Sequence, residues 1–500
     1  MITIHDEIAF RQDNFWNNIH FHPTDAIEDD WGGAILDRVA ADGTATTVRM
    51  YAMLEDIVTR SADGQLCYDF TLNDQRIDAM IARGFHLLIS YSFIPPCISS
   101  STVRTNTETA VSSRYKGKFL MTEPPHDWAE WEEICYTYTA HLVERYGLAR
   151  VSGWYLQCYN EPDVSGFFMH SLGTTEEARA KRIEAYCKMY EAFARGTMRV
   201  SDRLRIGGPA AATHLMLDAF LAFTSRRNLP VRFACAHSYG TSPQRINDGQ
   251  RPIDAQHNLD IIRKYLEIVQ RYYPDGLELV IDEWGASNCG FCNLDDCPQL
   301  LFRETEAFAA FYVQLIAGCI REKFPLRTLM ICLSGAHQPH QLPGKFPEFN
   351  GFRSFFTEHF IPKPIYGAYV LARKLGDAFL RCESEHKSLT ILPTRTAHGY
   401  ALLLSNASPS LDPNQPTLTD EIRMEISGTY RAAIYRIDRD HTNPYQVWQQ
   451  SGGAAQLDAL RQAGTLCADE SIVRADGTAR FPVSIPANGV LLIELTRMDA

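Results

Sequence analysis

The sequence lacks several features that would point to a membrane or a polyanion as partner. It has no apolar run of about 18 residues, the length that a membrane-spanning helix requires. Its first residues, MITIHDEIAF, show no basic stretch followed by an apolar core, so we expect no signal peptide. Lys and Arg number 48 against 60 Asp and Glu, a net charge of −12. We therefore expect neither nucleic acid nor an anionic membrane as partner.

Motifs for cofactors and metals are also missing. We find no glycine-rich phosphate loop, and the 16 histidines form no HExxH pattern. The 13 cysteines are odd in number and scattered, which favours reduced thiols and a cytoplasmic location. Cys289, Cys292 and Cys297 lie close together and could be metal ligands, free thiols or one disulfide. A tetrahedral site needs a fourth ligand, and none is nearby, so we expect no metal and no cofactor.

Short apolar segments alternate with helical periods from about residue 14 to 375. Continuous apolar runs are typical of strands that are buried on both faces. Eight strand–helix units in succession predict an α/β fold, a (β/α)8 TIM barrel. Helices are expected over 127–146, 176–200, 257–273 and 302–324, the first with Asp127 and Glu130 in a capping box. The expected strands are Phe15–Phe21, Thr47–Tyr51, Leu87–Ser92, Gly153–Tyr159, Leu204–Gly207, Phe233–Ser238, Leu277–Asp282 and Thr328–Leu333.

The pattern changes after about residue 376. Short strands between turn residues predict a C-terminal β-sandwich domain over 376–500. The N-terminal segment, residues 1–13, is expected to add an edge strand to it. A long polar segment, Ser99–Pro125, follows the third barrel strand and should lie over the C-terminal face of the barrel. The expected sandwich strands are Ser388–Pro393, Gly399–Ser405, Glu421–Ser427, Arg431–Tyr435 and Val490–Leu495.

Two of the expected barrel strands end in carboxylates. The fourth runs into Asn160-Glu161-Pro162 and the seventh into Asp282-Glu283-Trp284. Barrel enzymes place their catalytic groups at these strand ends. One carboxylic acid can protonate a glycosidic oxygen while a carboxylate about 5 Å away attacks the anomeric carbon. The pair predicts a retaining glycoside hydrolase; the alternative is that each glutamate caps a helix or pairs with an arginine.

The sequence around these motifs resembles glycoside hydrolase family 39, whose members include β-xylosidases and α-L-iduronidases. The likeness runs in order over nearly the whole chain. Besides the two carboxylate motifs, it is carried by Ser92-Phe-Ile-Pro95, Gly207-Gly-Pro209, His237-Ser-Tyr239, Glu348-Phe-Asn-Gly-Phe352, Pro362-Lys-Pro364 and the tail Pro486–Ile493.

The resemblance implies a role for each matching residue. Glu161 matches the general acid/base, whose pKa should be raised, and Glu283 the nucleophile, which should stay ionised. Asn160 matches the residue that hydrogen-bonds the sugar 2-hydroxyl. The other matching positions are His237 and Tyr239, beside the nucleophile, and Glu348, a carboxylate that contacts sugar hydroxyls.

Three positions depart from the family pattern. Tyr51 stands where the second strand usually ends in histidine, and Phe168 stands where a tryptophan commonly follows Asn-Glu-Pro. The eighth strand, Met330-Ile-Cys-Leu333, lacks the usual tryptophan. We still expect Tyr51, Phe168 and Trp284 to help bind the substrate.

These observations predict an exo-acting retaining glycosidase that releases one sugar, with β-xylose as the expected sugar. A family relative that acts on a galactoside, an arabinoside or a uronide would use the same chemistry; a uronide would require a cation at the sugar carboxylate, which the sequence does not place. Two hypotheses of a different class are a catalytically silent carbohydrate-binding protein and a metal-dependent protein built on the cysteine segment. The expected partner is an oligosaccharide or glycoside, and the oligomeric state stays open.

Overall fold

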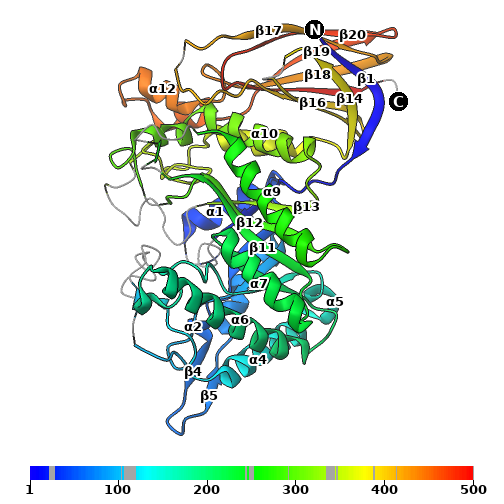
Figure 1. Cartoon of the computed structure of the whole chain (residues 1–500). Coiled ribbons are helices and arrows are strands. Elements are labelled where there is room, and N and C mark those ends of the chain that lie inside the picture. The colour runs from blue at the N-terminus through cyan, green and yellow to red at the C-terminus, as the bar shows by residue number, and fades with distance from the viewer. Residues whose placement is uncertain are drawn as a thin grey trace.

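The computed structural model describes residues 1–498 except 22–26, 28, 103, 106–119, 243–244, 247–252, 291, 334–343, 345–346, 387–388 and 413. The predicted barrel is confirmed: eight parallel strands close in the order β10-β11-β12-β13-β2-β3-β6-β9 (Figure 1). The strands are β2 (Asn18–His20), β3 (Thr47–Tyr51), β6 (His86–Tyr91), β9 (Tyr155–Cys158), β10 (Arg205–Ala211), β11 (Phe233–Thr241), β12 (Glu278–Ser287) and β13 (Leu326–Cys332).

The first barrel strand is shorter than the predicted Phe15–Phe21. The Asn14 side chain accepts hydrogen bonds from the backbone N–H groups of Trp16 and Asn17, so the chain is still turning there. The strand therefore begins only at Asn18.

Helices surround the barrel and mostly begin at side-chain caps. Asp127 caps α4 as predicted, but Glu130 does not complete a capping box, because both its oxygens accept from Arg60 at 2.8 Å. The predicted helix over 302–324 is divided by Thr305 into a 3-10 turn, η4 (Pro298–Glu304), and α10. The outer helices are α1 (Asp30–Ala41), α3 (Thr71–Ala82), α4 (Trp128–Tyr146), α6 (Glu176–Met198), α7 (His214–Arg227), α9 (Ala255–Tyr272), α10 (Glu306–Arg321) and α11 (Pro364–Arg373).

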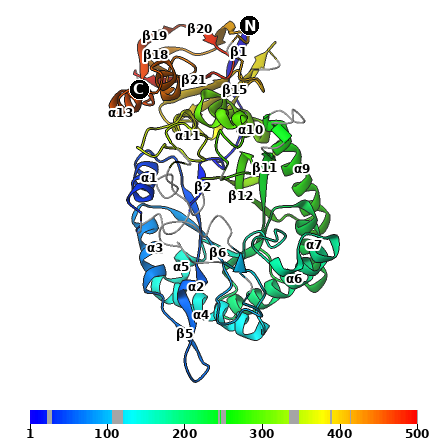
Figure 2. The same cartoon turned by 90° about the vertical axis from the view of Figure 1, so that its left-hand side faces the viewer.

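Smaller elements decorate the barrel. A hairpin of β4 (Val58–Arg60) and β5 (Leu66–Tyr68), preceded by α2 (Leu54–Ile57), projects from the end of the molecule farthest from the C-terminal sheet (Figures 1 and 2). Ser99 and Pro125 form an isolated bridge, which joins the two ends of the predicted polar segment. Most of that segment lies outside the described residues.

The C-terminal sheet has nine strands in the order β19-β18-β21-β16-β15-β14-β1-β17-β20. The N-terminal strand β1 lies between β14 and β17, so our prediction of an edge strand is wrong. The two outermost strands, β19 and β20, are consecutive in the chain and contact each other, so the sheet curls around its own core. Its strands are β1 (Ile2–Arg11), β14 (Ala378–Ser384), β15 (Thr390–Thr396), β16 (Gly399–Ser405), β17 (Leu418–Met424), β18 (Gly428–Ile437), β19 (Ala468–Ala475), β20 (Ala479–Ile485) and β21 (Val490–Arg497).

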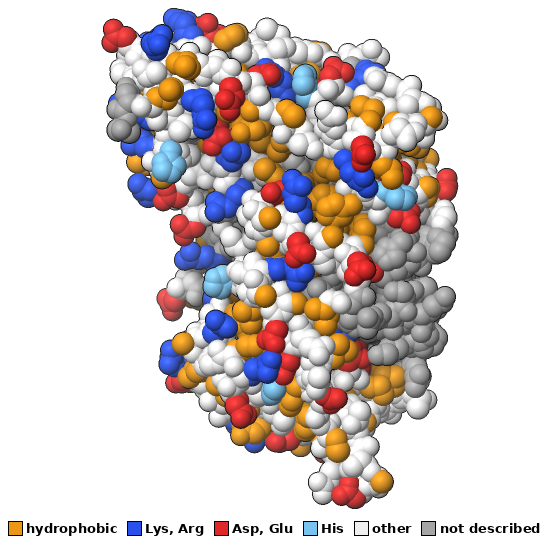
Figure 3. Space-filling view, turned by 180° about the vertical axis from the view of Figure 1, so that it is seen from behind, with side chains coloured by type: hydrophobic (Ala, Val, Ile, Leu, Met, Phe, Trp, Pro, Cys, Tyr) orange, Lys and Arg blue, Asp and Glu red, His pale blue; other side chains and the backbone are white. Residues whose placement is uncertain are grey.

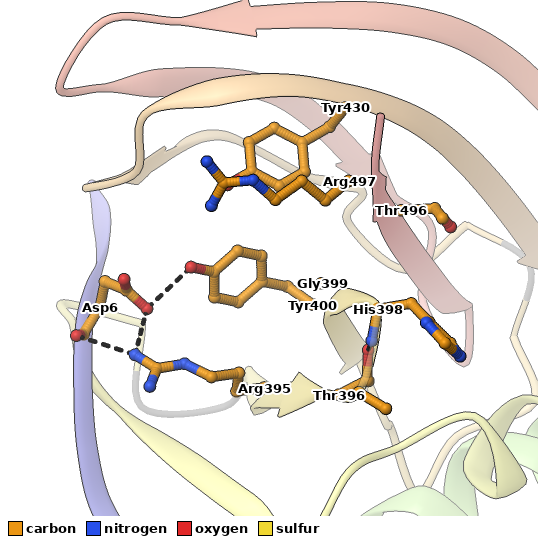
Figure 4. Close-up of a pocket in the computed structure, with 10 residues that line it drawn as sticks. Asp6, Arg395, Thr396, His398, Gly399, Tyr400, Tyr430, Thr496 and Arg497 are labelled. Atoms are coloured by element: carbon orange, nitrogen blue, oxygen red, sulfur yellow. Dashed lines mark hydrogen bonds and ion pairs between the residues drawn. The ribbon is translucent and has the colours of Figure 1, made fainter. Parts of the chain in front are cut away.

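Polar contacts fix β1 within the sheet, at a pocket shown in Figure 4. There the Asp6 carboxylate accepts hydrogen bonds from Arg395 at 2.6 Å and from the Tyr400 hydroxyl at 2.9 Å. The pairing of β1 requires contacts across nearly 400 residues of sequence, which explains why local pattern alone misplaced this strand.

The sheet and the barrel share a hydrophobic core. Side chains alternate along β16: Leu402 and Leu404 face the core of the sheet, whereas Ala401 and Leu403 belong to the cluster of the barrel. That second face packs on α10, as Figure 1 shows. Both faces of β16 are thus buried.

No helix in the described ranges is long and apolar enough to cross a membrane. On the face shown in Figure 3, acidic and basic side chains are intermixed.

Candidate active site

Glu161 and Glu283 face each other at the C-terminal end of the barrel. Glu283 lies within β12 and is paired with His237 of β11, and Glu161 follows β9, with its backbone N–H bonded to the Ala210 carbonyl at 3.1 Å. A carboxylate oxygen of Glu161, a ring nitrogen of His237 and a carboxylate oxygen of Glu283 all lie within 4.8 Å of one another. A direct attack by one carboxylate requires a separation of about 5 Å, whereas a pair that activates water between them is about 6.5 Å or more apart.

The backbone around Glu161 is unusual. Tyr159 and Glu161 have φ angles of 65° and 43°, in the left-handed region that non-glycine residues rarely occupy. Such conformations cost about 1–3 kcal/mol each and persist only where the surroundings enforce them. Here they turn the chain sharply after β9, directly before Pro162.

Glu283 is held as a carboxylate. Arg49 donates to it at 2.7 Å and the Tyr239 hydroxyl at 2.5 Å. Burial alone would raise the pKa of Glu283, but the charges of His237 and Arg49 and the Tyr239 hydrogen bond hold this pKa well below its usual value. Glu283 is therefore ionised at neutral pH.

Glu161 has the opposite tendency. Burial raises its pKa, and the negative charge of Glu283 raises it further, while His237, whose Nδ1 lies 2.7 Å from the Glu161 carboxylate, works against this rise. Burial lowers the pKa of His237, but the surrounding carboxylates Glu283, Asp282 and Glu161 raise it well above its usual value. The environments of the two glutamates thus push their pKa values apart, as an acid and a nucleophile require.

Arg49 is a site residue that the sequence analysis missed. It is fully buried in β3 and donates to Glu283, to Asn160 Oδ1 at 2.6 Å and to Gln157 Oε1 at 2.9 Å, and it pairs with Asp282 at 3.1 Å. One guanidinium thus connects Glu283 to Asn160, the residue beside Glu161. The available signal was a charged residue inside a strand that is otherwise buried.

Replacing Arg49 with Met removes a cation and a charge-assisted hydrogen bond from Glu283. The pKa of Glu283 should rise, so the low-pH limb of the kcat/KM profile should move to higher pH, and the rate at neutral pH should fall by about 10²-fold. A pH–rate profile of the purified variant measures both effects.

Arg76→Met is the matched control for that variant. Arg76 is also buried and donates to Asp56 at 3.1 Å, away from the two glutamates. Its loss should lower the melting temperature but leave the low-pH limb in place. A folded Arg49→Met protein with an unmoved low-pH limb contradicts the role assigned to Arg49.

Four more of the predicted residues join the same cluster. Asn160, His237 and Tyr239 make the contacts described above. The Tyr51 ring lies 5.1 Å from the ring of His20 and 5.3 Å from the Arg49 guanidinium carbon. Burial raises the pKa of Tyr51, and the charge of Glu283 raises it further, so Tyr51 remains a neutral hydroxyl at the site.

Two predicted aromatic residues lie elsewhere. Trp284 is fully buried and stacks on Tyr312 at 5.8 Å, because alternation along β12 turns it away from the face that carries Glu283. Phe168 is fully buried as well and packs on Tyr159 at 5.4 Å. Neither aromatic ring presents a surface on which a sugar can stack, which is at odds with our expectation that they bind substrate.

Glu348 is also placed differently from the expectation. Its carboxylate accepts a hydrogen bond from the His359 backbone at 3.0 Å and contacts the ring of the same residue. Within the described ranges, no contact joins Glu348 to Glu161 or Glu283. Contact with sugar hydroxyls therefore stays a prediction for Glu348.

The cysteine segment forms one disulfide, between Cys289 and Cys292. Cys297 is buried and takes no part in this disulfide. The sequence left three possibilities open for this segment: metal ligands, free thiols or one disulfide. The structure has the disulfide, so Cys289 and Cys292 are not reduced thiols. Two thiols engaged with each other cannot also serve as ligands, so this segment does not form a three-cysteine metal site.

Among the described residues, two groups of side chains around Glu283 could share a metal ion. They are His20, Glu283 and Cys332, and Glu161, His237 and Glu283. Both include Glu283, which Arg49 already contacts with a full positive charge. This charge disfavours a second cation, so the donor set fits a metal poorly.

Comparison with known proteins decides the family. The model of Glycosyl hydrolases family 39 matches residues 2–479. This chain belongs to glycoside hydrolase family 39. The resemblance seen in the sequence is confirmed, and the protein is a glycosidase.

Individual relatives match this chain over different lengths. A β-xylosidase of Caldicellulosiruptor saccharolyticus is 26% identical over 456 residues, 87% of this chain and 84% of the relative. Human α-L-iduronidase is 27% identical over 172 residues, 33% of this chain and 21% of the relative. The solved structure of a monomeric β-xylosidase from Caulobacter crescentus CB15 superposes with a TM-score of 0.81 at 20% identity and covers 99% of both chains.

Proposed function

We propose that this family 39 glycosidase is retaining and acts by double displacement, with Glu283 as nucleophile and Glu161 as general acid/base. The observation that carries the proposal is the pair of facing carboxylates, within 4.8 Å, whose pKa values are shifted in opposite directions. The mechanism needs one group protonated and the other ionised at the same pH.

The first step joins the sugar to the enzyme. A carboxylate oxygen of Glu283 attacks the anomeric carbon while Glu161 gives its proton to the glycosidic oxygen, and that bond breaks to release the leaving group as an alcohol. In the second step the Glu161 carboxylate takes a proton from water. The water oxygen attacks the anomeric carbon and Glu283 departs as a carboxylate.

Asn160 is positioned to stabilise both transition states. Its Oδ1 accepts from Arg49, so its amide NH2 group is left to donate to the sugar 2-hydroxyl. This hydrogen bond strengthens as positive charge develops at the anomeric carbon. Tyr239 donates to the other oxygen of Glu283, which helps to keep this carboxylate ionised before it attacks.

A β-xyloside is the proposed substrate, cleaved from the chain end. The relatives named β-xylosidase support this choice, since one of them covers most of the chain. A panel of nitrophenyl glycosides of pentoses, hexoses and uronic acids tests it. We expect kcat/KM for the β-xyloside to exceed that for the β-glucoside by at least about tenfold, because an added hydroxymethyl group must fit the same pocket.

A second candidate, a uronide, is favoured by Arg353. This buried side chain donates to the Tyr239 hydroxyl at 3.4 Å and lies 3.1 Å from the Cys332 sulfur. Within the described ranges no carboxylate pairs with Arg353, and its Nε has no hydrogen-bond partner. A buried cation without a carboxylate partner is costly, and an acidic sugar could supply that carboxylate.

The same panel separates these candidates. A higher kcat/KM for a uronide than for the xyloside would identify a uronide as the substrate. Binding without hydrolysis of any glycoside in the panel would instead indicate a silent binding protein, and loss of activity with a chelator would indicate a metal-dependent reaction.

A further inference from the structure

A large cleft opens from Glu161 toward the ends of α6, α7 and α9. Its volume is about 920 Å³, the upper part of the usual range for ligand pockets. Glu161, His237 and Tyr239 form its inner end. Its outer lining includes Arg179, Leu215, Arg245, Asp260, Ile261 and Lys264.

The position of Glu161 assigns this cleft to the leaving group. In the proposed reaction Glu161 protonates the glycosidic oxygen, so the leaving group has to lie within hydrogen-bond reach of Glu161. The nucleophile attacks from the opposite side of the sugar ring. A cleft that begins at Glu161 and extends outward is therefore where the second unit of the substrate lies.

The cleft carries positive charge in a protein whose net charge is −12. Arg179 and Arg245 line it, and no ion pair involves either residue among the described residues. Among the residues that the structure describes, Lys264 pairs with Glu267 alone, at 3.1 Å and in an exposed position, where such a pair is weak.

Acidic groups do not balance this charge. Besides Glu161, which carries a proton before the first step, Asp260 is the acid in the lining. Its carboxylate accepts from Arg263 and from Gln256, both at 2.8 Å and both on its own helix. Asp260 shares Arg263 with Glu322, which pairs with the same guanidinium at 2.8 Å. The three cations Arg179, Arg245 and Lys264 still outnumber this one carboxylate in the lining.

We propose that this cleft selects a leaving group that bears a negative charge, a saccharide unit with a carboxylate or sulfate substituent. Arg179, Arg245 and Lys264 supply the attraction, while Leu215 and Ile261 offer apolar surface to the ring. The inference rests on the proposed function, because it takes Glu161 as the acid. It deepens that function by naming the substrate class on the leaving-group side.

Two matched substrates test the inference. They are the glycosides of 7-hydroxycoumarin-4-acetic acid and of its N-methylamide, on the sugar that the panel selects; the two phenols are of similar acidity. We expect the acid to be preferred about 3- to 10-fold in kcat/KM at low ionic strength, and the preference to shrink toward one in 0.5 M NaCl. Without the cleft, the negative net charge of the protein would disfavour the acid.

Variants show which residues cause the preference for the acid. Arg179→Gln/Lys264→Gln should bring the acid-to-amide ratio toward one. Arg203→Gln/Lys323→Gln removes the same charges from exposed positions in the turns before β10 and β13, at the other end of the barrel, and should keep the ratio. A wild-type ratio of one or less, or a ratio that the first double variant leaves unchanged, overturns the inference.

A binding measurement separates this inference from the catalytic proposal. Calorimetric titration of the same acid and amide glycosides into Glu283→Ala reports the preference in Kd without turnover. Preference for the acid in Kd, with no hydrolysis by the wild type, contradicts the proposed function alone. Equal Kd values contradict the inference alone.

Discussion

Replacing Glu283 with Ala should reduce kcat for an aryl glycoside by at least about 10⁴-fold, which corresponds to about 5.5 kcal/mol of barrier. The reason is that the variant lacks the carboxylate that forms the covalent intermediate in the proposed mechanism. Steady-state kinetics with a nitrophenyl glycoside measures the loss. Hydrolysis at the parental rate contradicts the assignment of the nucleophile.

The same variant has a chemical rescue and a matched control. Azide can enter the space that Glu283 vacates and attack once from that side, so the product should be a glycosyl azide of inverted configuration. Glu278→Ala is the control: Glu278 begins the same strand and pairs with Arg205 at 2.6 Å at the opposite end of the barrel. It should lose stability while keeping the activity.

Replacing Glu161 with Ala should slow hydrolysis according to the leaving group. Alkyl glycosides and oligosaccharides need the proton and should lose about 10³-fold or more, whereas dinitrophenyl glycosides, whose leaving group needs no proton, should lose much less in the first step. Azide should now attack the covalent intermediate and give a glycosyl azide of retained configuration. Equal losses across leaving groups would contradict the role of Glu161.

The pH profile gives an independent reading of Glu161. The proposed mechanism requires Glu283 ionised and Glu161 protonated, so the rate should fall at low pH as Glu283 gains a proton and at high pH as Glu161 loses one. Glu161→Gln cannot lose a proton, so its high-pH limb should disappear. Glu55→Gln is the control, because burial raises the pKa of the Glu55 carboxyl to about 7 and it could otherwise be mistaken for the acid.

The local pattern of apolar residues was sufficient to predict much of the fold. Apolar runs gave each barrel strand to within a few residues, because a strand buried on both faces has to be apolar throughout. The ends of α4 followed from Asp127 and Gly147, one a cap and the other a residue with a φ of 84°. The N-terminal strand was misplaced, since its neighbours lie hundreds of residues away.

Local sequence likewise predicted some residues of the site and not others. That Glu161 and Glu283 face each other could be predicted from the sequence, because each lies at the C-terminal end of a barrel strand and these ends meet at one face of the barrel. Arg49 could not be linked to them, because nothing in Thr47–Tyr51 shows which carboxylate the guanidinium will reach across the barrel. We expected Trp284 to bind substrate because it follows Glu283 in the sequence. Neighbouring residues of a strand point to opposite faces, so Trp284 points away from Glu283.

Covalent trapping tests the central claim most directly. A dinitrophenyl 2-deoxy-2-fluoro glycoside of the preferred sugar should react once and then stall, since fluorine destabilises the positive charge of both transition states while the good leaving group favours the first step. Mass spectrometry of the intact protein and of its peptides locates the sugar. The account predicts one sugar per chain, attached to Glu283. A label on another residue, or none while the parent glycoside is hydrolysed, contradicts it.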